Sequence, residues 1–211
     1  EFYIDPAKQI DTVQSKLDDI NSTYINPEEL TLIDPACGSG HILVEAYNIF
    51  REIYLEQGYQ ISEIPELILS KNLYGLDICP RATQLANFSL LMKGRQDDKK
   101  FLEKSVKLNV IVLEDSHDLN TEVLTQNVDL SNYGLQLSDL TILKQLFSQA
   151  RNYGTLIKIP EVLKDKFSAL TMFSEAVSEN LFNSFSLKKL HSLLLQSNLL
   201  DSQYDFVVTN P

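Results

Sequence analysis

The chain has 211 residues, of which 44% are apolar, and this length suits one domain with a substantial core better than two small ones. Eighteen basic residues against 29 acidic ones give a formal net charge of −11, whereas surfaces that follow nucleic-acid phosphates are rich in Lys and Arg. No apolar run approaches the roughly 20 residues that cross a bilayer, and the first residues lack the features of a signal peptide. We therefore expect a cytoplasmic protein that binds DNA poorly by itself.

The cysteines and histidines predict no metal site. Cys37 and Cys79 cannot form a disulfide framework, and neither has a neighbouring Cys or His that could complete a zinc site. We expect both to be small buried thiols. The three histidines, His41, His117 and His191, show no ligand or triad spacing, and His41 is interpreted as a residue at a helix start.

The first elements in chain order are helices and strands in alternation. Apolar residues at helical spacing predict an amphipathic helix over residues 6–20. A short apolar run over 30–34 stops at Pro35 and a Gly-Ser-Gly turn, which is typical of a buried parallel strand. The helix that follows carries an apolar stripe and ends before Gly58.

A second and a third strand follow the same pattern. A short helix over 64–69 precedes a strand over 73–77, and Pro80 begins the next helix. The third strand covers 109–113 and ends at two acidic residues. Alternation of this kind predicts an α/β fold with a parallel sheet and right-handed crossovers.

A fourth strand, over 204–209, comes only after roughly 85 residues, far more than the median connection of about 4–6 residues. Helical periodicity over 135–150, 161–182 and 187–200 predicts that this segment is a helical insertion on one edge of the sheet. The expected organisation is a helical flank at 1–29, strand-helix units at 30–118, the insertion at 119–202 and the fourth strand at 203–211.

The turn after the first strand has the features of a nucleoside-cofactor site. Residues 34–40 read Asp-Pro-Ala-Cys-Gly-Ser-Gly between a strand and a helix N-terminus, where glycines let the backbone turn sharply beside a ligand. Asp77, at the end of the next strand, can accept both ribose hydroxyls of an adenosine.

The kind of adenosine cofactor follows from two residues. The dinucleotide fingerprint requires a third glycine, and Leu43 stands at that position. Asp34 would repel a pyrophosphate, whereas it would attract the cationic amino group of a methionine moiety. We therefore expect S-adenosylmethionine.

These residues resemble the gamma group of amino-methyltransferases that modify adenine in DNA. The run from Asp34 to His41 resembles the first motif of that family, which binds the methionine moiety. The run from Tyr74 to Ile78 resembles the second, which implies that Asp77 binds the ribose and that Ile78 packs on the adenine. Leu113-Glu114-Asp115-Ser116 resembles the third, which implies that Asp115 approaches the adenine amino group.

The end of the chain resembles the catalytic motif of the same family, Asn-Pro-Pro followed by Tyr or Phe. The fourth strand delivers Asn210 and Pro211, and the chain stops there, so we expect a fragment that is weakly active or inactive alone. The Asn210 side-chain oxygen and the Pro211 carbonyl would accept hydrogen bonds from the exocyclic amine of a flipped adenine and direct its lone pair toward the methyl group. The resemblance implies a Rossmann-like class I methyltransferase fold, present in part.

The expected site residues are therefore of two kinds. The catalytic ones are Asn210 and Pro211, and those that bind cofactor are Asp34, Pro35, Ala36, Cys37, Gly38, Gly40, Asp77, Ile78 and Asp115. The large insertion and the second motif are similar to the long methyltransferases of restriction-modification enzymes and of BREX phage-defence systems. That likeness implies that double-stranded DNA is bound through regions absent from this chain.

Three other interpretations of the same residues stay open. A methyltransferase that acts on protein glutamine or on RNA would use the same Asn-Pro motif, and a basic recognition surface elsewhere would distinguish a DNA enzyme from it. A nicotinamide-dependent oxidoreductase would instead bind a dinucleotide. A non-catalytic module that kept the fold is the third class. The sequence leaves the oligomeric state open.

Overall fold

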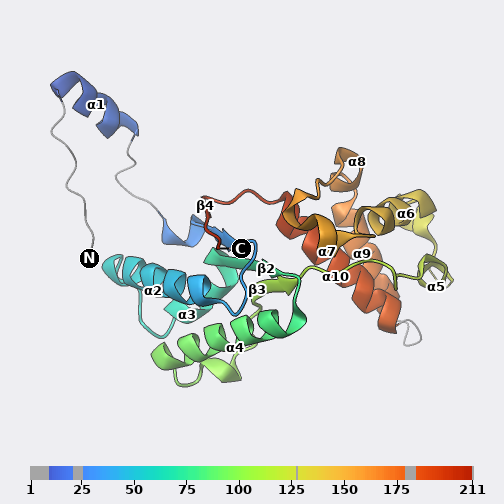
Figure 1. Ribbon diagram of the computed structural model, residues 1–211, viewed down its shortest axis with the longest axis horizontal. Coiled ribbons are helices and arrows are strands. Elements are labelled where there is room, and N and C mark those ends of the chain that lie inside the picture. The colour runs from blue at the N-terminus through green and yellow to red at the C-terminus, as the bar shows by residue number, and fades with distance from the viewer. Residues whose placement is uncertain (1–9, 21–25, 127, 179–183, 211) are drawn as a thin grey trace.

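Four parallel strands organise the chain in the computed structural model, which describes residues 10–20, 26–126, 128–178 and 184–210 (Figure 1). They are β1 (Leu32–Asp34), β2 (Leu73–Asp77), β3 (Asn109–Val112) and β4 (Phe206–Val207). The spatial order is β3-β2-β1-β4, and each neighbouring pair is parallel. The expected α/β class with a parallel sheet is confirmed.

The helices of the first half lie where the sequence predicts them. The described helices are α1 (Asp11–Ile20), α2 (His41–Glu56), α3 (Ile64–Leu67) and α4 (Pro80–Asp97). A π-helical turn, Ile68–Asn72, continues α3 up to the start of β2. The helix expected over 6–20 begins at Asp11 within the described residues, and residues 1–9 lie outside them.

Helices α2, α3 and α4 cover one face of the sheet. Side chains on a strand alternate between its two faces, so Leu73 of β2 and Val110 of β3 pack with Leu43 and Phe50 of α2 and with Leu90 of α4. These side chains are almost completely buried. The apolar stripe that the sequence shows on α2 is therefore the stripe that packs on the sheet.

The segment between β3 and β4 is helical. Its helices are α5 (Thr121–Thr125), α6 (Leu137–Leu146), α7 (Ala150–Tyr153), α8 (Glu161–Lys164), α9 (Phe167–Ser178) and α10 (Ser184–Asp201), with 3₁₀ turns at Leu130–Tyr133 and Gly154–Leu156. Helix α10 packs against β3, and the group lies to the side of the sheet (Figure 1).

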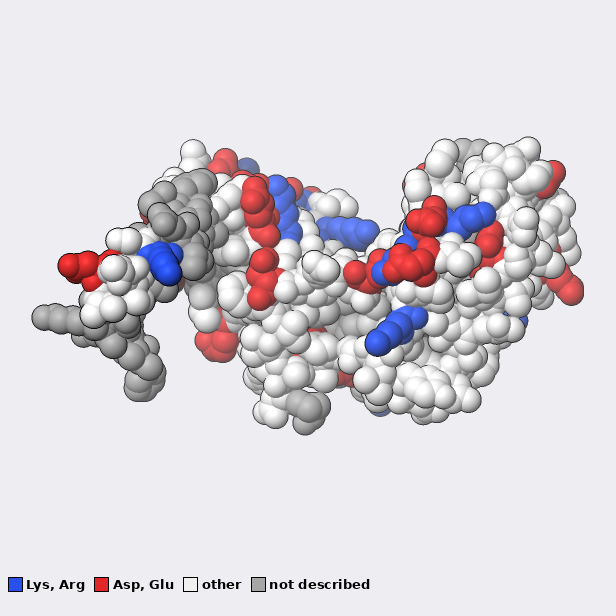
Figure 2. Space-filling model, turned by 90° about the horizontal axis from the view of Figure 1, so that it is seen from above, with Lys and Arg blue, Asp and Glu red and all other residues white. Residues whose placement is uncertain are grey.

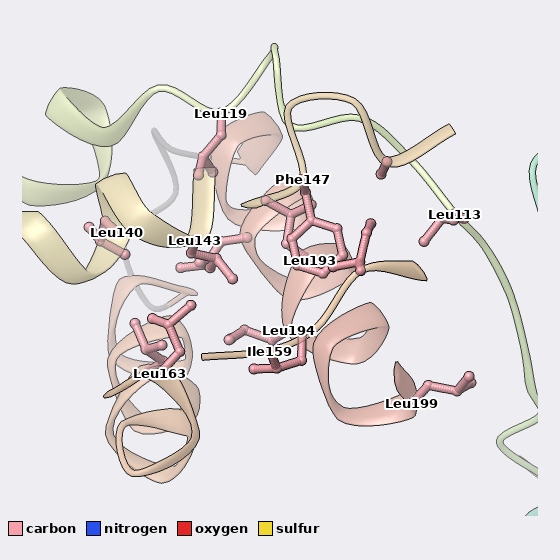
Figure 3. Close-up of a cluster of buried hydrophobic side chains, with 14 of the residues drawn as sticks. Leu113, Leu119, Leu140, Leu143, Phe147, Ile159, Leu163, Leu193, Leu194 and Leu199 are labelled. Atoms are coloured by element: carbon pink, nitrogen blue, oxygen red, sulfur yellow. The ribbon is translucent and has the colours of Figure 1, made fainter. Parts of the chain in front are cut away.

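This helical segment has a core of its own, shown in Figure 3. Three side chains point toward one another: Leu143 of α6, Phe147 of the turn after α6, and Leu193 of α10. The same cluster extends to Ile33 and Leu76, on the sheet face opposite α2 and α4. The sheet therefore has one apolar cluster on each face.

Two of the stretches with helical periodicity are each interrupted in the structure. In the stretch 135–150, α6 ends at Leu146 and α7 begins only at Ala150, and the carbonyls of Lys144 and Phe147 accept hydrogen bonds from Ser116. The stretch 161–182 divides into α8 and α9 at Lys166, whose ammonium group donates to the Gly134 carbonyl at 2.7 Å. Residues 179–183 lie outside the described residues.

Strand β4 is shorter than predicted, and one cysteine is more exposed than predicted. The apolar run 204–209 was interpreted as a strand, but only Phe206–Val207 form one, and both side chains face solvent because β4 is an edge strand. Cys37 is buried as expected, whereas Cys79 is exposed because it caps α4 at the carboxyl edge of the sheet. No helix in the described ranges is long and apolar enough to span a membrane.

Candidate functional site

The loop between β1 and α2 is folded by its own hydrogen bonds and by β2. The Asp34 carboxylate accepts from the N–H of Ala36 at 3.1 Å, and the Gly40 N–H donates to the Cys37 carbonyl at 2.8 Å. The Cys37 N–H donates to the Leu76 carbonyl at 2.9 Å, which ties the loop to β2. The loop is thereby fixed at the carboxyl edge of the sheet.

Both glycines of this loop adopt left-handed backbone conformations, with φ of 51° at Gly38 and 86° at Gly40. Residues with a Cβ rarely adopt such angles. At Gly40 a Cβ would also lie only 2.8 Å from the Cβ of Ala86 on α4, whereas nothing lies within 4 Å at Gly38. Gly40 therefore permits close packing of α2 on α4, and Gly38 leaves open space beside the loop.

Asp77 joins the loop to the end of β2. One carboxylate oxygen accepts from the Gly38 N–H at 2.8 Å, and the other accepts from the Cys79 N–H at 2.7 Å. A carboxylate offers about four acceptor positions, so about two remain for further donors. Next to it, the Ile78 side chain is 52% exposed at the same edge.

Asp34 is the buried charge of the site, with 1% of its surface exposed. Burial raises the pKa of this carboxyl above its ordinary value, and hydrogen bonds from the Ala36 N–H and the Thr209 side chain partly oppose that shift. The negative charge of Asp77 raises the pKa further. A cation placed beside Asp34 would stabilise its ionised form.

The contact with Thr209 brings the end of the chain to the loop. Strand β4 pairs with β1 through Val207 and Ile33, and the Val208 N–H donates to the Ile33 carbonyl at 3.0 Å. Asn210 follows Thr209 directly and is exposed. Pro211 lies outside the described residues. Thr209 was not among the predicted site residues, although its place just before Asn-Pro at the end of the strand was a usable signal.

The cysteine of the loop does not present a reactive thiolate. Burial raises the pKa of the Cys37 thiol to about 12, and the charges of Asp34 and Asp77 act in the same direction. Cys37 is therefore a packing residue whose backbone shapes the loop. His41 is the first residue of α2, as predicted, and its Nδ1 lies 3.0 Å from the Ser39 hydroxyl.

Asp115 lies after the end of β3, where its carboxylate accepts from the N–H of Arg151 in α7 at 3.1 Å. The structure thus brings Asp34, the two glycines and Asp77 together and connects Asp115 to the helical segment. In the described residues, no group of three or more His, Cys, Asp or Glu is placed to hold a metal ion.

Comparison with known proteins identifies the family of the chain. Residues 8–127, more than half of the chain, match the MmeI DNA-methyltransferase domain family. The chain belongs to this family. The matched region contains Asp34, both glycines of the loop and Asp77.

Two relatives of this MmeI-type domain match over the whole chain. The adenine-specific methyltransferase BrxX of Escherichia coli O9:H4 (strain HS) is 37% identical, and the aligned part is 19% of that protein. The adenine-specific methyltransferase PglX of Lacticaseibacillus casei (strain Zhang) is 28% identical, and the aligned part is 17% of it. The chain therefore spans about a fifth of the length of these relatives.

Proposed function

We propose that this chain is the S-adenosylmethionine-binding part of an enzyme that methylates the exocyclic amine of adenine in DNA, in phage defence. One observation supports the proposal most: Asp34, Asp77 and the end of β4 lie together at the carboxyl ends of the strands. In open α/β sheets, ligands bind outside the carboxyl ends of the strands where the strand order reverses. In the order β3-β2-β1-β4 that point lies between β1 and β4.

The residues at this edge fit a sulfonium cofactor better than a dinucleotide. Asp34 would attract the ammonium group of the methionine moiety and would repel phosphates. The first N–H groups of α2 have no partner within the helix and suit the carboxylate of that moiety. Asp77 has acceptor capacity for the ribose hydroxyls, and the exposed Ile78 offers an apolar surface for the base. We extend this assignment to a class I methyltransferase fold, of which the four strands form one half.

In the proposed transfer of the methyl group, residues of this chain have the following roles. The bound cofactor supplies an electrophilic methyl group. Asn210 accepts a hydrogen bond from the adenine amine, and together with the carbonyl of Pro211 it orients the lone pair of the nitrogen. Asp34 stabilises the positive charge of the cofactor's amino group, and the Thr209 hydroxyl keeps that carboxylate close to β4.

DNA binding is assigned to parts of the longer protein. The net charge of −11 opposes contact with phosphates. Among the described residues on the face in Figure 2, blue Lys and Arg side chains are scattered among red Asp and Glu and form no continuous basic strip. Other regions of the full-length enzyme would therefore flip the adenine into the site.

The experiment that tests the proposal is calorimetric titration of the full-length protein with S-adenosylmethionine, S-adenosylhomocysteine and a nicotinamide dinucleotide. We expect the first two alone to bind and Asp77→Ala to abolish their binding, because the ribose hydroxyls lose their acceptor. The control is Asp118→Ala, which changes an exposed aspartate far in sequence from the loop between β1 and α2. Preference for the dinucleotide would overturn the methyltransferase assignment.

Methyl transfer is tested in the same preparations with Asn210→Ala. We expect this variant to bind the cofactor within a few-fold of the wild-type affinity and to lose DNA adenine methylation. Mass spectrometry of digested DNA separates methylated adenine from methylated cytosine. Methylation of RNA or of protein glutamine with no DNA product would favour the corresponding alternative substrates, and retained turnover would remove Asn210 from the mechanism.

A further inference from the structure

The loop after β3, Glu114–Ser116, is held by the helical segment and not by the sheet. The carboxylate of Glu114 accepts from the Lys189 ammonium at 3.0 Å and from the Ser192 hydroxyl at 3.4 Å. The Glu114 N–H donates to the side-chain oxygen of Gln196 at 3.1 Å. All three partners are on α10, more than 70 residues away in sequence.

The next two residues of the loop are bound in the same way by α6 and α7. Asp115 accepts from the Arg151 N–H at 3.1 Å. The Ser116 N–H donates to the Phe147 carbonyl at 2.9 Å, and the Ser116 hydroxyl donates to the Lys144 carbonyl. Every residue of the loop therefore has at least one hydrogen bond to the helical segment.

The side chains of α10 that bind Glu114 are themselves buried or held by hydrogen bonds. Gln196 is fully buried, and its amide nitrogen donates to the Ser192 hydroxyl at 3.0 Å, which directs its oxygen toward Glu114. The Lys189 side chain is only 11% exposed, although Lys188, beside it, is exposed. A buried amide and a mostly buried ammonium group are costly unless they are paired, so the loop and α10 depend on each other.

The loop lies one strand away from the ribose-binding carboxylate. Asp77 on β2 pairs with Val112 on β3, and neighbouring strands are about 4.8 Å apart. An adenosine whose ribose is held by Asp77 therefore reaches the end of β3 with its base.

We propose that α10 positions the Glu114–Ser116 loop for the adenosine end of the cofactor, with Lys189 and Gln196 as the positioning residues. This inference rests on the proposed function. It gives the helical segment a role in cofactor binding, because a change of packing within α10 changes the shape of the base-binding edge. Coupling of this kind is reciprocal, so bound cofactor also stabilises the helical segment.

The test uses the full-length protein, with Lys189→Met and the matched control Lys188→Met. Affinity is measured by calorimetry for S-adenosylhomocysteine and for 5′-methylthioadenosine, which has the adenosine without the amino-acid group. We expect Lys189→Met to weaken both ligands by about tenfold, within the usual range of coupling between sites, and Lys188→Met to leave both unchanged. Lys189→Arg keeps the charge and should restore most of the affinity.

The same variants separate positioning from simple loss of stability. Hydrogen exchange of α10 should slow when S-adenosylhomocysteine binds to the wild-type protein, and this slowing should be reduced in Lys189→Met. A lower melting temperature with unchanged affinity for both ligands would overturn the inference and leave the proposed function intact. A wild-type protein that binds neither ligand would overturn both this inference and the proposed function. If Lys189→Met fails to fold, Lys189→Gln compared with Lys188→Gln takes its place.

Discussion

The strand-helix units from β1 to β3 and the helical segment from α5 to α10 differ in what their buried groups do. The strand-helix units bury the carboxyl of Asp34, whose raised pKa shows that its charge is poorly solvated. The core of the helical segment is mainly Leu, Ile and Phe side chains. A buried charge opposes stability and suits a cationic ligand, whereas an apolar core stabilises the fold. Asp34 therefore fits the proposed cationic ligand, whereas the apolar side chains buried in both regions serve packing.

The largest effect on stability is expected in the helical segment. Phe173 of α9 is fully buried and its ring makes an edge contact with Tyr133, so Phe173→Ala should lower the free energy of unfolding by about 4 kcal/mol. Urea denaturation followed by circular dichroism measures this change. Met172→Ala is the neighbouring control, because that side chain is mostly exposed. A loss of under about 1 kcal/mol would contradict the assignment of Phe173 to a well-packed core.

A smaller effect is expected in the loop of the strand-helix units. Gly40→Ala combines a left-handed backbone with a 2.8 Å approach to Ala86, and should lower the free energy of unfolding by about 3 kcal/mol. In Gly38→Ala only the left-handed backbone is unfavourable, because the surroundings of residue 38 are open. This change should lower the free energy of unfolding by about 1 kcal/mol. Equal losses in parallel urea titrations would show that contact with α4 does not require a glycine at position 40.

The smallest effect has the opposite sign and depends on pH. A raised pKa of Asp34 in the folded state means that its contribution to stability is present below the ordinary value of 3.8 and is lost as the pH rises through the folded-state pKa. Asp34→Asn should therefore raise the free energy of unfolding at pH 7 in the absence of ligand, and this gain should disappear toward pH 4. Titration with S-adenosylmethionine should show weaker binding by the same variant. A destabilised Asn variant at pH 7 would show that the hydrogen bonds to the carboxylate from Ala36 and Thr209 outweigh the cost of burying its charge.

The sequence predicted the strand-helix units well because local signals mark their ends. Pro35 and the glycines stop β1, and Pro80 begins α4. The strand β2 has the bounds that the apolar run 73–77 predicts. The motif residues Asp34 and Asp77 also follow from position, because parallel strands place their carboxyl ends at one edge.

The helical segment was predicted less well because its details depend on distant contacts. Helical periodicity in the sequence runs to residue 150, but α6 ends at Leu146, near the carbonyls of Lys144 and Phe147 that accept hydrogen bonds from the distant Ser116. The ion pair between Glu114 and Lys189 joins residues 75 positions apart, and no local pattern indicates it. The place of β4 at the edge of the sheet was not predicted, since an apolar run does not reveal whether a strand lies at the centre or the edge.

The two cysteines give the protein a natural reporter of ligand binding. Cys79 is exposed, and its N–H is bonded to the Asp77 carboxylate, so a thiol-reactive fluorophore attached there would lie beside the group that we propose to bind the ribose. Cys37 is buried with a pKa of about 12 and would remain unlabelled in the folded protein. Attachment of one dye, without any engineered cysteine in this domain, would therefore convert occupancy of the edge into an optical signal. Protection of Cys79 from labelling would report the same event in the unmodified protein.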